Sequence, residues 1–276
     1  MKNKLRSLLT LAVVVIAVFM LTMAVYETGK FDVRNGTLVK YSGGGGAVTI
    51  PDNVTVIGEE AFAECRKITS VTVPDGVTSI ERAAFRNCDS MTTVTLPDSL
   101  RKIGGNAFND CDSLRTVAIP QNVSSIGDEA FWICKSLASI SVHDKNGSYA
   151  SKDGVLYDKQ FTTLAQYPGG KRDTSFVIPS TVTIIGSAAF DSNEVLKSIT
   201  IPNGVTQIDD KEFKYCSALT SIVIPDTVTR VGDEAFKYCE SMESVVISEN
   251  MTEISSQMFK HCDSLKRIYI PATLLR

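Results

Sequence analysis

The chain has 276 residues, of which 43% are hydrophobic and 21% charged, and its formal net charge is −3. This apolar content can form a core, which excludes an intrinsically disordered chain, and the charge balance lacks the basic excess typical of nucleic-acid-binding proteins. The only histidines, His143 and His261, leave little room for a histidine-based active site.

The first 30 residues differ from the rest of the chain. Lys2, Lys4 and Arg6 precede an uncharged, apolar run of 18 residues from Leu8 to Val25. This order is typical of a secretory signal peptide or of an N-terminal membrane anchor, and the run is near the lower length limit for a spanning helix. Because the positive end stays inside, both alternatives place the following residues on the extracellular face, secreted or anchored by one N-terminal transmembrane helix.

The remaining sequence repeats with a period of 23 residues. The strongest column is phenylalanine, and a second column holds all seven cysteines, with Asn193 at the one other place. The members of these two columns are Phe62, Phe85, Phe108, Phe131, Phe190, Phe213, Phe236 and Phe259, and Cys65, Cys88, Cys111, Cys134, Cys216, Cys239 and Cys262. A period of this length indicates a solenoid, in which each unit buries its apolar face against its neighbours.

Each repeat begins with a strand-like segment. In the second repeat, Val71 and Val73 alternate with Ser70 and Thr72, which predicts a short strand, and Pro74 then ends it. The following apolar positions, such as Val77, Ile80, Ala84 and Phe85, have the three-and-four spacing of a helical or 3₁₀ turn. The sequence therefore predicts a parallel β-sheet on one face of the solenoid and short helical or 3₁₀ turns on the other.

These columns resemble a known family, the BspA-like leucine-rich-repeat surface proteins with 23-residue repeats. The resemblance covers about residues 31 to 276. One repeat carries the motif as Ser113-Leu114-Arg115-Thr116-Val117-Ala118-Ile119-Pro120, then Val123, Ile126-Gly127, Ala130-Phe131 and Cys134. The resemblance implies a curved solenoid at a cell surface that adheres to host or neighbouring-cell proteins.

The period is interrupted once, between His143 and Pro179. The extra length contains turn signals and two strand-like runs, at residues 155–157 and 163–167, which predict an inserted β-hairpin. A similar pattern at 37–46 predicts an N-terminal capping hairpin. We expect a signal peptide or N-terminal membrane anchor at 1–30, a capping hairpin at 31–50, repeats at 51–142, an extended repeat with the insert at 143–178, and repeats without an evident C-terminal cap at 179–276.

The cysteine column does not have the close ligand pairs of a zinc site. Disulfides between neighbouring turns are possible on distance, but each thiol would have an equally good partner on both sides. The resemblance implies that Asn or Cys at this position faces inward, where Asn193 would satisfy backbone groups of the turn. We therefore predict buried free thiols, with no cofactor, no metal site and no catalytic site in the chain.

The last repeats carry the candidate partner surface. Lys-Tyr or Lys-His pairs recur before the cysteine there, and the outward strand positions become more apolar and aromatic toward the C-terminus. The candidate residues are Lys214, Tyr215, Lys237, Tyr238, Lys260, His261, Arg267 and Tyr269. Duplication of repeats with a solvated edge would explain the same pattern, so both interpretations stay open at this point.

The sequence favours an exported protein-binding or adhesion module that is not an enzyme. Its expected partner is an extracellular protein or a glycan, with no nucleic acid, and with the membrane involved only through the N-terminal segment. The alternative is a structural or self-assembling surface spacer that associates through its C-terminal edge strand, because open strand edges can pair with other chains.

Overall fold

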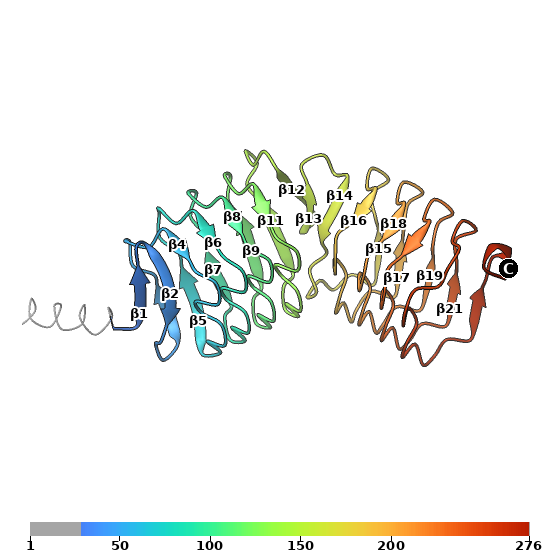
Figure 1. Cartoon of the computed structure of the whole chain (residues 1–276), viewed down its shortest axis with the longest axis horizontal. Helices are drawn as coiled ribbons and strands as arrows, with labels where there is room; N and C mark the ends of the chain where they lie inside the picture. Colours follow the sequence, from blue (N-terminus) through green and yellow to red (C-terminus); the bar gives the residue numbers. More distant parts are fainter. Residues whose placement is uncertain (1–28, 276) are drawn as a thin grey trace, which may run out of the picture.

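The computed structural model describes residues 29–275 and shows a curved β-solenoid (Figure 1). The first 28 residues, which include nearly all of the predicted signal peptide or anchor, lie outside the described part. Within the described residues, no helix has both the length and the hydropathy that are needed to cross a bilayer.

One side of the solenoid is formed by the strands that the alternating pattern predicts, and they pair in parallel with a step of one repeat. Ser70, for example, pairs with Thr93, and Ser198 with Ser221. Three sheets make up this side: β3 (Gly46–Thr49), β5 (Ile68–Thr72) and β7 (Thr93–Thr95); β9 (Thr116–Ile119) and β11 (Ser139–Val142); and β15 (Ser175–Val177), β17 (Ser198–Thr200), β19 (Ser221–Val223), β21 (Ser244–Val246) and β22 (Arg267–Tyr269).

A second, narrower set of parallel strands contains the isoleucine column. In the first half its strands are β4 (Val56–Ile57), β6 (Ser79–Ile80), β8 (Lys102–Ile103) and β10 (Ser125–Ile126). In the second half they are β16 (Ile184–Ile185), β18 (Gln207–Ile208) and β20 (Arg230–Val231). These two-residue strands stand where the spacing predicted helical turns, and the one helical element of the described residues is the 3₁₀ segment η1 (Ala272–Leu275).

The turns after the second set of strands differ from helices in their hydrogen bonds. Phe62 donates its amide to the carbonyl of Ala84 in the next repeat, and Phe85 donates to Ala107 in the same way. An α-helix would keep these bonds within the segment. The predicted solenoid with parallel sheets is thus confirmed, while the helical or 3₁₀ character of its turns is replaced by overlapping β-turns that bond between repeats.

The inserted hairpin is confirmed, with one more strand than expected. β12 (Tyr149–Lys152), β13 (Val155–Asp158) and β14 (Thr163–Gln166) pair antiparallel, and β14 then pairs in parallel with β16. At the other break in the pattern, β1 (Phe31–Arg34) and β2 (Thr37–Tyr41) form an antiparallel hairpin, and β2 pairs with β4. Both irregular segments therefore join the second set of strands.

The core consists of two hydrophobic clusters that meet at the insert. Leu156 belongs to the first cluster, whereas its neighbours Val155 and Tyr157 belong to the second. Successive side chains of a strand point to opposite sides, so β13 separates the clusters and contributes to both. In each half the phenylalanine rings stack, for example Phe85 on Phe108 with centroids 5.2 Å apart and Phe213 on Phe236 at the same distance.

One buried residue next to the second cluster has an acidic side chain. Glu212 stands in the alanine column before phenylalanine, is fully buried, and neither of its carboxylate oxygens has a hydrogen-bond partner within residues 29–275. Burial raises the pKa of this carboxyl well above its usual value, and the nearby Asp209 and Asp210 add to the effect. A buried carboxyl without a partner costs stability when it ionises.

We expect Glu212→Ala to stabilise the protein at pH 7 by about 1–3 kcal/mol, because it restores the alanine that all other repeats except the last have there and removes an unpaired acid. The folded wild type binds a proton that the unfolded chain releases above about pH 4.5, so its stability falls as pH rises through the raised pKa. Urea unfolding at pH 7 and pH 4 measures this, with the exposed Glu253→Ala as control. If the increase in unfolding free energy caused by Glu212→Ala is as large at pH 4 as at pH 7, ionisation of the buried Glu212 is not its cause.

Candidate functional surfaces

The lysine and aromatic residues predicted from the last repeats form a ladder on the turns. The ring of Tyr215 stacks on Tyr238 at 4.6 Å between centroids, and Tyr238 stacks on His261 at the same distance. Lys214 and Lys237 lie over the tyrosine rings, with each Nζ between 5.4 and 5.5 Å from a centroid. The structure therefore brings these side chains together as one ordered edge.

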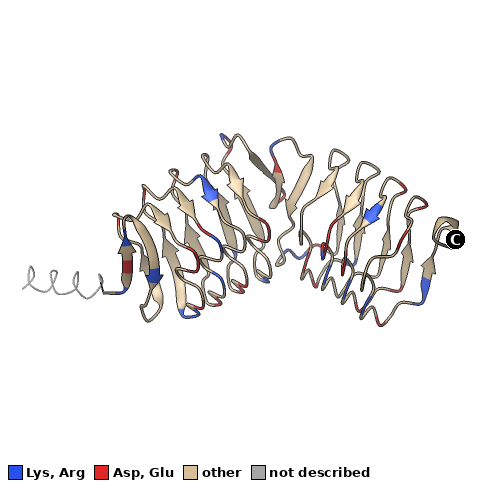
Figure 2. Cartoon of the chain, viewed as in Figure 1, with Lys and Arg blue, Asp and Glu red and all other residues tan. Residues whose placement is uncertain are grey.

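The charge of this edge is lower than the lysine column suggests. Lys214 and Lys237 both donate hydrogen bonds to Glu234, at 2.6 and 2.8 Å, and their side chains are only 14% and 12% exposed. The two lysines hold the pKa of Glu234 at about 2. Lys260 and His261, in contrast, are exposed. Figure 2 shows positive and negative residues interspersed along the turns of this half.

The other two candidate residues, Arg267 and Tyr269, lie elsewhere, on the outward face of β22. Tyr269 is in register with Val246 on β21, and Val246 with Val223 on β19. At the other end of the same sheet, Val177 is in register with Thr200. Val177, Val223 and Tyr269 are 69%, 58% and 57% exposed. We call Val177, Thr200, Val223, Val246 and Tyr269 the apolar stripe.

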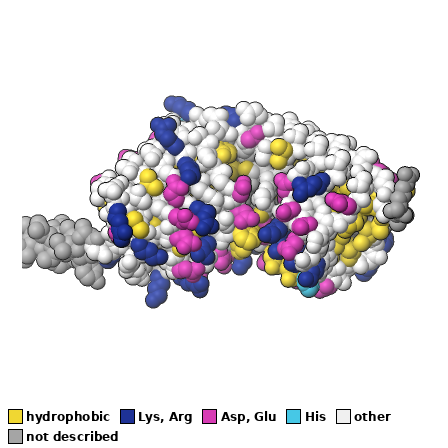
Figure 3. All heavy atoms as spheres, in the orientation of Figure 1, with side chains coloured by type: hydrophobic (Ala, Val, Ile, Leu, Met, Phe, Trp, Pro, Cys, Tyr) yellow, Lys and Arg dark blue, Asp and Glu magenta, His cyan; other side chains and the backbone are white. Residues whose placement is uncertain are grey.

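The first half of the solenoid has hydroxyl residues in this column at every position except Ala118. Thr49, Thr72 and Thr95 are in register there, and Ala118 is in register with Ser141. The difference gives the C-terminal half an exposed apolar surface. Contiguous exposed hydrophobic patches on soluble proteins often mark sites of association with a partner. Figure 3 likewise shows hydrophobic side chains gathered toward the C-terminal end.

Two residues of these surfaces escaped prediction from the sequence. Val177 lies one period before Thr200, so its column was visible, but the neighbouring insert obscured it. Glu234 binds lysines 20 and 3 residues away, a pairing that only the stacking of turns creates. Within the described residues, no group of three or more His, Cys, Asp or Glu side chains could hold a metal ion.

The cysteine column lies inside the turns as free thiols. Six of the seven are buried, and Cys65 is half-buried. Cys88, for example, donates its Sγ hydrogen to the carbonyl of Phe62 at 3.3 Å, and Cys111 does the same to Phe85. Asn193 takes the same place, where its Oδ1 accepts hydrogen bonds from the amides of Val195 and Leu196. The predicted role of the column, satisfying backbone groups of the turn, is confirmed.

The stacked turns, parallel sheets and outward surfaces define a leucine-rich-repeat solenoid. The BspA type leucine rich repeat region matches this sequence in 6 copies, over residues 45–152 and 170–276. These residues are well over half of the chain, and the protein therefore belongs to the BspA-type leucine-rich-repeat family, as its columns predicted.

Solved structures show the same fold. A leucine-rich repeat protein from Eubacterium ventriosum is similar with a TM-score of 0.67 and 26% identity, over 87% of this chain and 81% of that chain. A leucine rich cell surface protein from Faecalibacterium prausnitzii is similar with a TM-score of 0.57 and 25% identity, over 86% and 92% of the two chains. The pneumococcal vaccine antigen PcpA shares the fold, with a TM-score of 0.56 and 21% identity over 86% and 84%. No curated protein matches this chain.

The ladder predicts a specific acid dependence of stability. Because the pKa of Glu234 is lowered to about 2, its ion pairs contribute stability above the unfolded value near 4.5, and this contribution is lost as pH falls toward 2. We expect Glu234→Gln to lose less than about 1 kcal/mol at pH 7, since the groups remain partly solvated. Thermal unfolding measured from pH 7 to pH 2 should show that the variant loses less stability on acidification than the wild type. Equal losses of stability in both proteins would contradict the pairing.

The thiols provide a second prediction. Burial raises the pKa of Cys65 to about 11 and that of Cys134 to about 12, which disfavours the reactive thiolate. Cys65 is half-buried, and a hydrogen bond with Cys239 lowers the pKa of Cys262, so in the native protein we expect only these two thiols to react with a thiol-specific dye. All 7 cysteines should react after unfolding without reductant. Cysteine pairs that stay unreactive until a reductant is added would instead show disulfides.

Proposed function

We propose that this chain is an exported, non-catalytic cell-surface module that binds a protein through the apolar stripe of its C-terminal sheet. The observation that carries the proposal is the exposure of Val223 and Tyr269, 58% and 57%, in a column where the first half has threonine, alanine or serine. Evenly spaced apolar side chains on a rigid sheet suit a protein partner, because interface cores are enriched in aromatic residues and depleted of charge.

Membership of the BspA-type leucine-rich-repeat family supports a location outside the cell. The similar protein from Faecalibacterium prausnitzii is itself described as a leucine rich cell surface protein. The basic and apolar order of residues 1–30 agrees with export of this chain. Protease treatment of intact cells that express the full chain would place it at the surface if the solenoid is cleaved while a cytoplasmic protein is not.

The ladder is a second part of the proposed surface. Since Lys214 and Lys237 share Glu234, the groups available to a partner there are Lys260, His261 and the 39% exposed ring of Tyr215. This arrangement favours contact with a protein or glycan through stacked rings and one exposed lysine over attraction of a highly acidic partner.

The alternative function, self-assembly, rests on β22. Within residues 29–275 this strand pairs with β21 alone, and Ile268, Tyr269 and Ile270 are 40%, 57% and 49% exposed. A strand edge of this kind can pair with a second copy. Light scattering after size-exclusion chromatography tests it, because a mass that stays monomeric as concentration rises would remove the assembly function.

We expect Val223→Thr combined with Tyr269→Thr to lower binding of the purified protein to immobilised collagen or laminin at least 10-fold, about 1.4 kcal/mol. The variant gives the C-terminal half the residue type of the first half, so strand propensity is preserved. The matched control is Thr72→Ser with Thr95→Ser in the same column. Equal binding by both variants, or no binding to either matrix protein, would contradict the proposed role of the stripe.

A further inference from the structure

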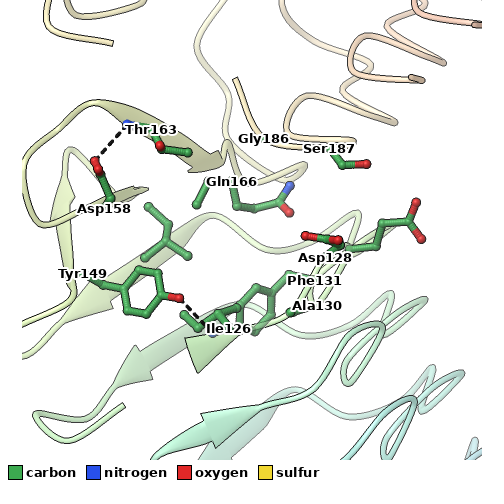
Figure 4. Close-up of a pocket in the computed structure, with 14 residues that line it drawn as sticks. Ile126, Asp128, Ala130, Phe131, Tyr149, Asp158, Thr163, Gln166, Gly186 and Ser187 are labelled. Carbon is green, nitrogen blue, oxygen red and sulfur yellow. Dashed lines mark hydrogen bonds between the residues drawn. The ribbon is translucent and has the colours of Figure 1, made fainter. Parts of the chain in front are cut away.

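A cavity opens where the insert interrupts the solenoid. It has a volume of about 290 Å³ and lies between residues 126–131 on one side and Gly186 and Ser187 on the other (Figure 4). Thr163, Ala165 and Gln166 of the insert also line it. This site is separate from the apolar stripe, and nothing in the proposed function depends on it.

The cavity exists because one turn is too short. Leu164 is in register with Ile185, and the ring of Tyr167 stacks on Phe190. Leu164 and Tyr167 are three positions apart in the chain, whereas Ile185 and Phe190 are five apart, as are the corresponding pairs of the other repeats. The insert therefore continues the strand and the aromatic stack but lacks two residues between them, and the missing backbone leaves the space.

Backbone groups on the two walls lose their partners as a result. Phenylalanines in the complete stacks donate their amides to the next repeat, as Phe108 does to Ala130 and Phe190 to Glu212. Within residues 29–275, by contrast, the amides of Glu129 and Phe131 make no hydrogen bond, and no amide donates to the carbonyl of Ser187. One wall thus presents donors and the other an acceptor.

The side chains add acceptors and negative charge. Gln166 donates hydrogen bonds from its Nε2 to the carbonyls of Tyr167 and Ala189. Its Oε1 accepts no hydrogen bond from the described residues. The carboxyl groups that line the cavity belong to Asp128, Glu129 and Asp158, and no lysine or arginine lines it. Asp128 and Glu129 form no ion pair in the described part of the chain, whereas Asp158 accepts hydrogen bonds from Thr162 and Thr163.

We propose that this cavity, the repeat gap, binds a short peptide segment that carries a lysine or arginine. The peptide would supply the missing backbone: its carbonyls would accept hydrogen bonds from the amides of Glu129 and Phe131, and its amides would donate to the carbonyl of Ser187 and to Gln166 Oε1. Its cationic side chain would pair with Asp128 and Glu129. Addition of a segment to unpaired backbone groups is an established mode of peptide recognition.

The test is a titration of the isotopically labelled full chain with the blocked peptide acetyl-Gly-Gly-Lys-Gly-Gly-amide, monitored by amide NMR shifts. We expect saturable shifts at Glu129 and Phe131, and binding of the glutamate counterpart that is at least 10-fold weaker. Two findings would overturn the proposal: signals of Glu129 and Phe131 that stay unmoved in the folded protein, or equal binding of the two peptides.

Matched variants separate the gap from the rest of the surface. Ser187→Leu should fill the cavity and abolish the shifts, whereas Ser256→Leu, at the same column of an intact turn, should leave them unchanged. Asp128→Asn should weaken binding about 3-fold, and the exposed Asp75→Asn should not. If Ser187→Leu and Ser256→Leu bind the peptide alike while both remain folded, the gap is not its site. The stripe variant Val223→Thr with Tyr269→Thr should bind it normally.

Discussion

The hydrogen bond from one turn to the next is the interaction on which the rest of this structure depends. Each phenylalanine amide of a complete stack is satisfied by a carbonyl one repeat further on, as in the bond from Phe62 to Ala84. A turn therefore satisfies only part of its own backbone, as in the bond from Ala61 to Gly58, and buried backbone groups must be paired. Each turn must therefore present its carbonyls at the same positions as the turn before it. This requirement fixes the 23-residue period and stacks equivalent side chains on one another.

This constraint explains why so much of the sequence could be interpreted without a structure. The strands, the proline stops and the phenylalanine stack follow from the repeated columns, because stacking brings residues one period apart into contact. The inward position of the thiols was implied by the resemblance to the family. The turns could not be derived in this way. Ala83 and Asn87 adopt φ values of 54° and 59°, which side chains other than glycine rarely do. Bonds between repeats offset that cost, and a single repeat contains no signal for them.

The candidate surfaces show the same division. The lysine column, the aromatic pairs and the increase in apolar outward residues toward Tyr269 could be predicted from the sequence, because they follow the period. The neutralisation of Lys214 and Lys237 was not, since Glu234 reaches both from one turn. The repeat gap was also missed, because Leu164 and Tyr167 belong to their columns only after β14 has paired with β16.

A solenoid that depends on bonds between turns is most open to a ligand where one turn fails to bond. Along an intact stack, the backbone donors and acceptors pair with those of neighbouring repeats. A partner there contacts only side chains, as on the apolar stripe. At the gap the chain itself exposes backbone groups, and the adjoining clusters remain packed because β13 contributes side chains to both. The insert can therefore tolerate a short turn without loss of the fold, so that stability comes from the regular repeats and backbone recognition is confined to the irregular one.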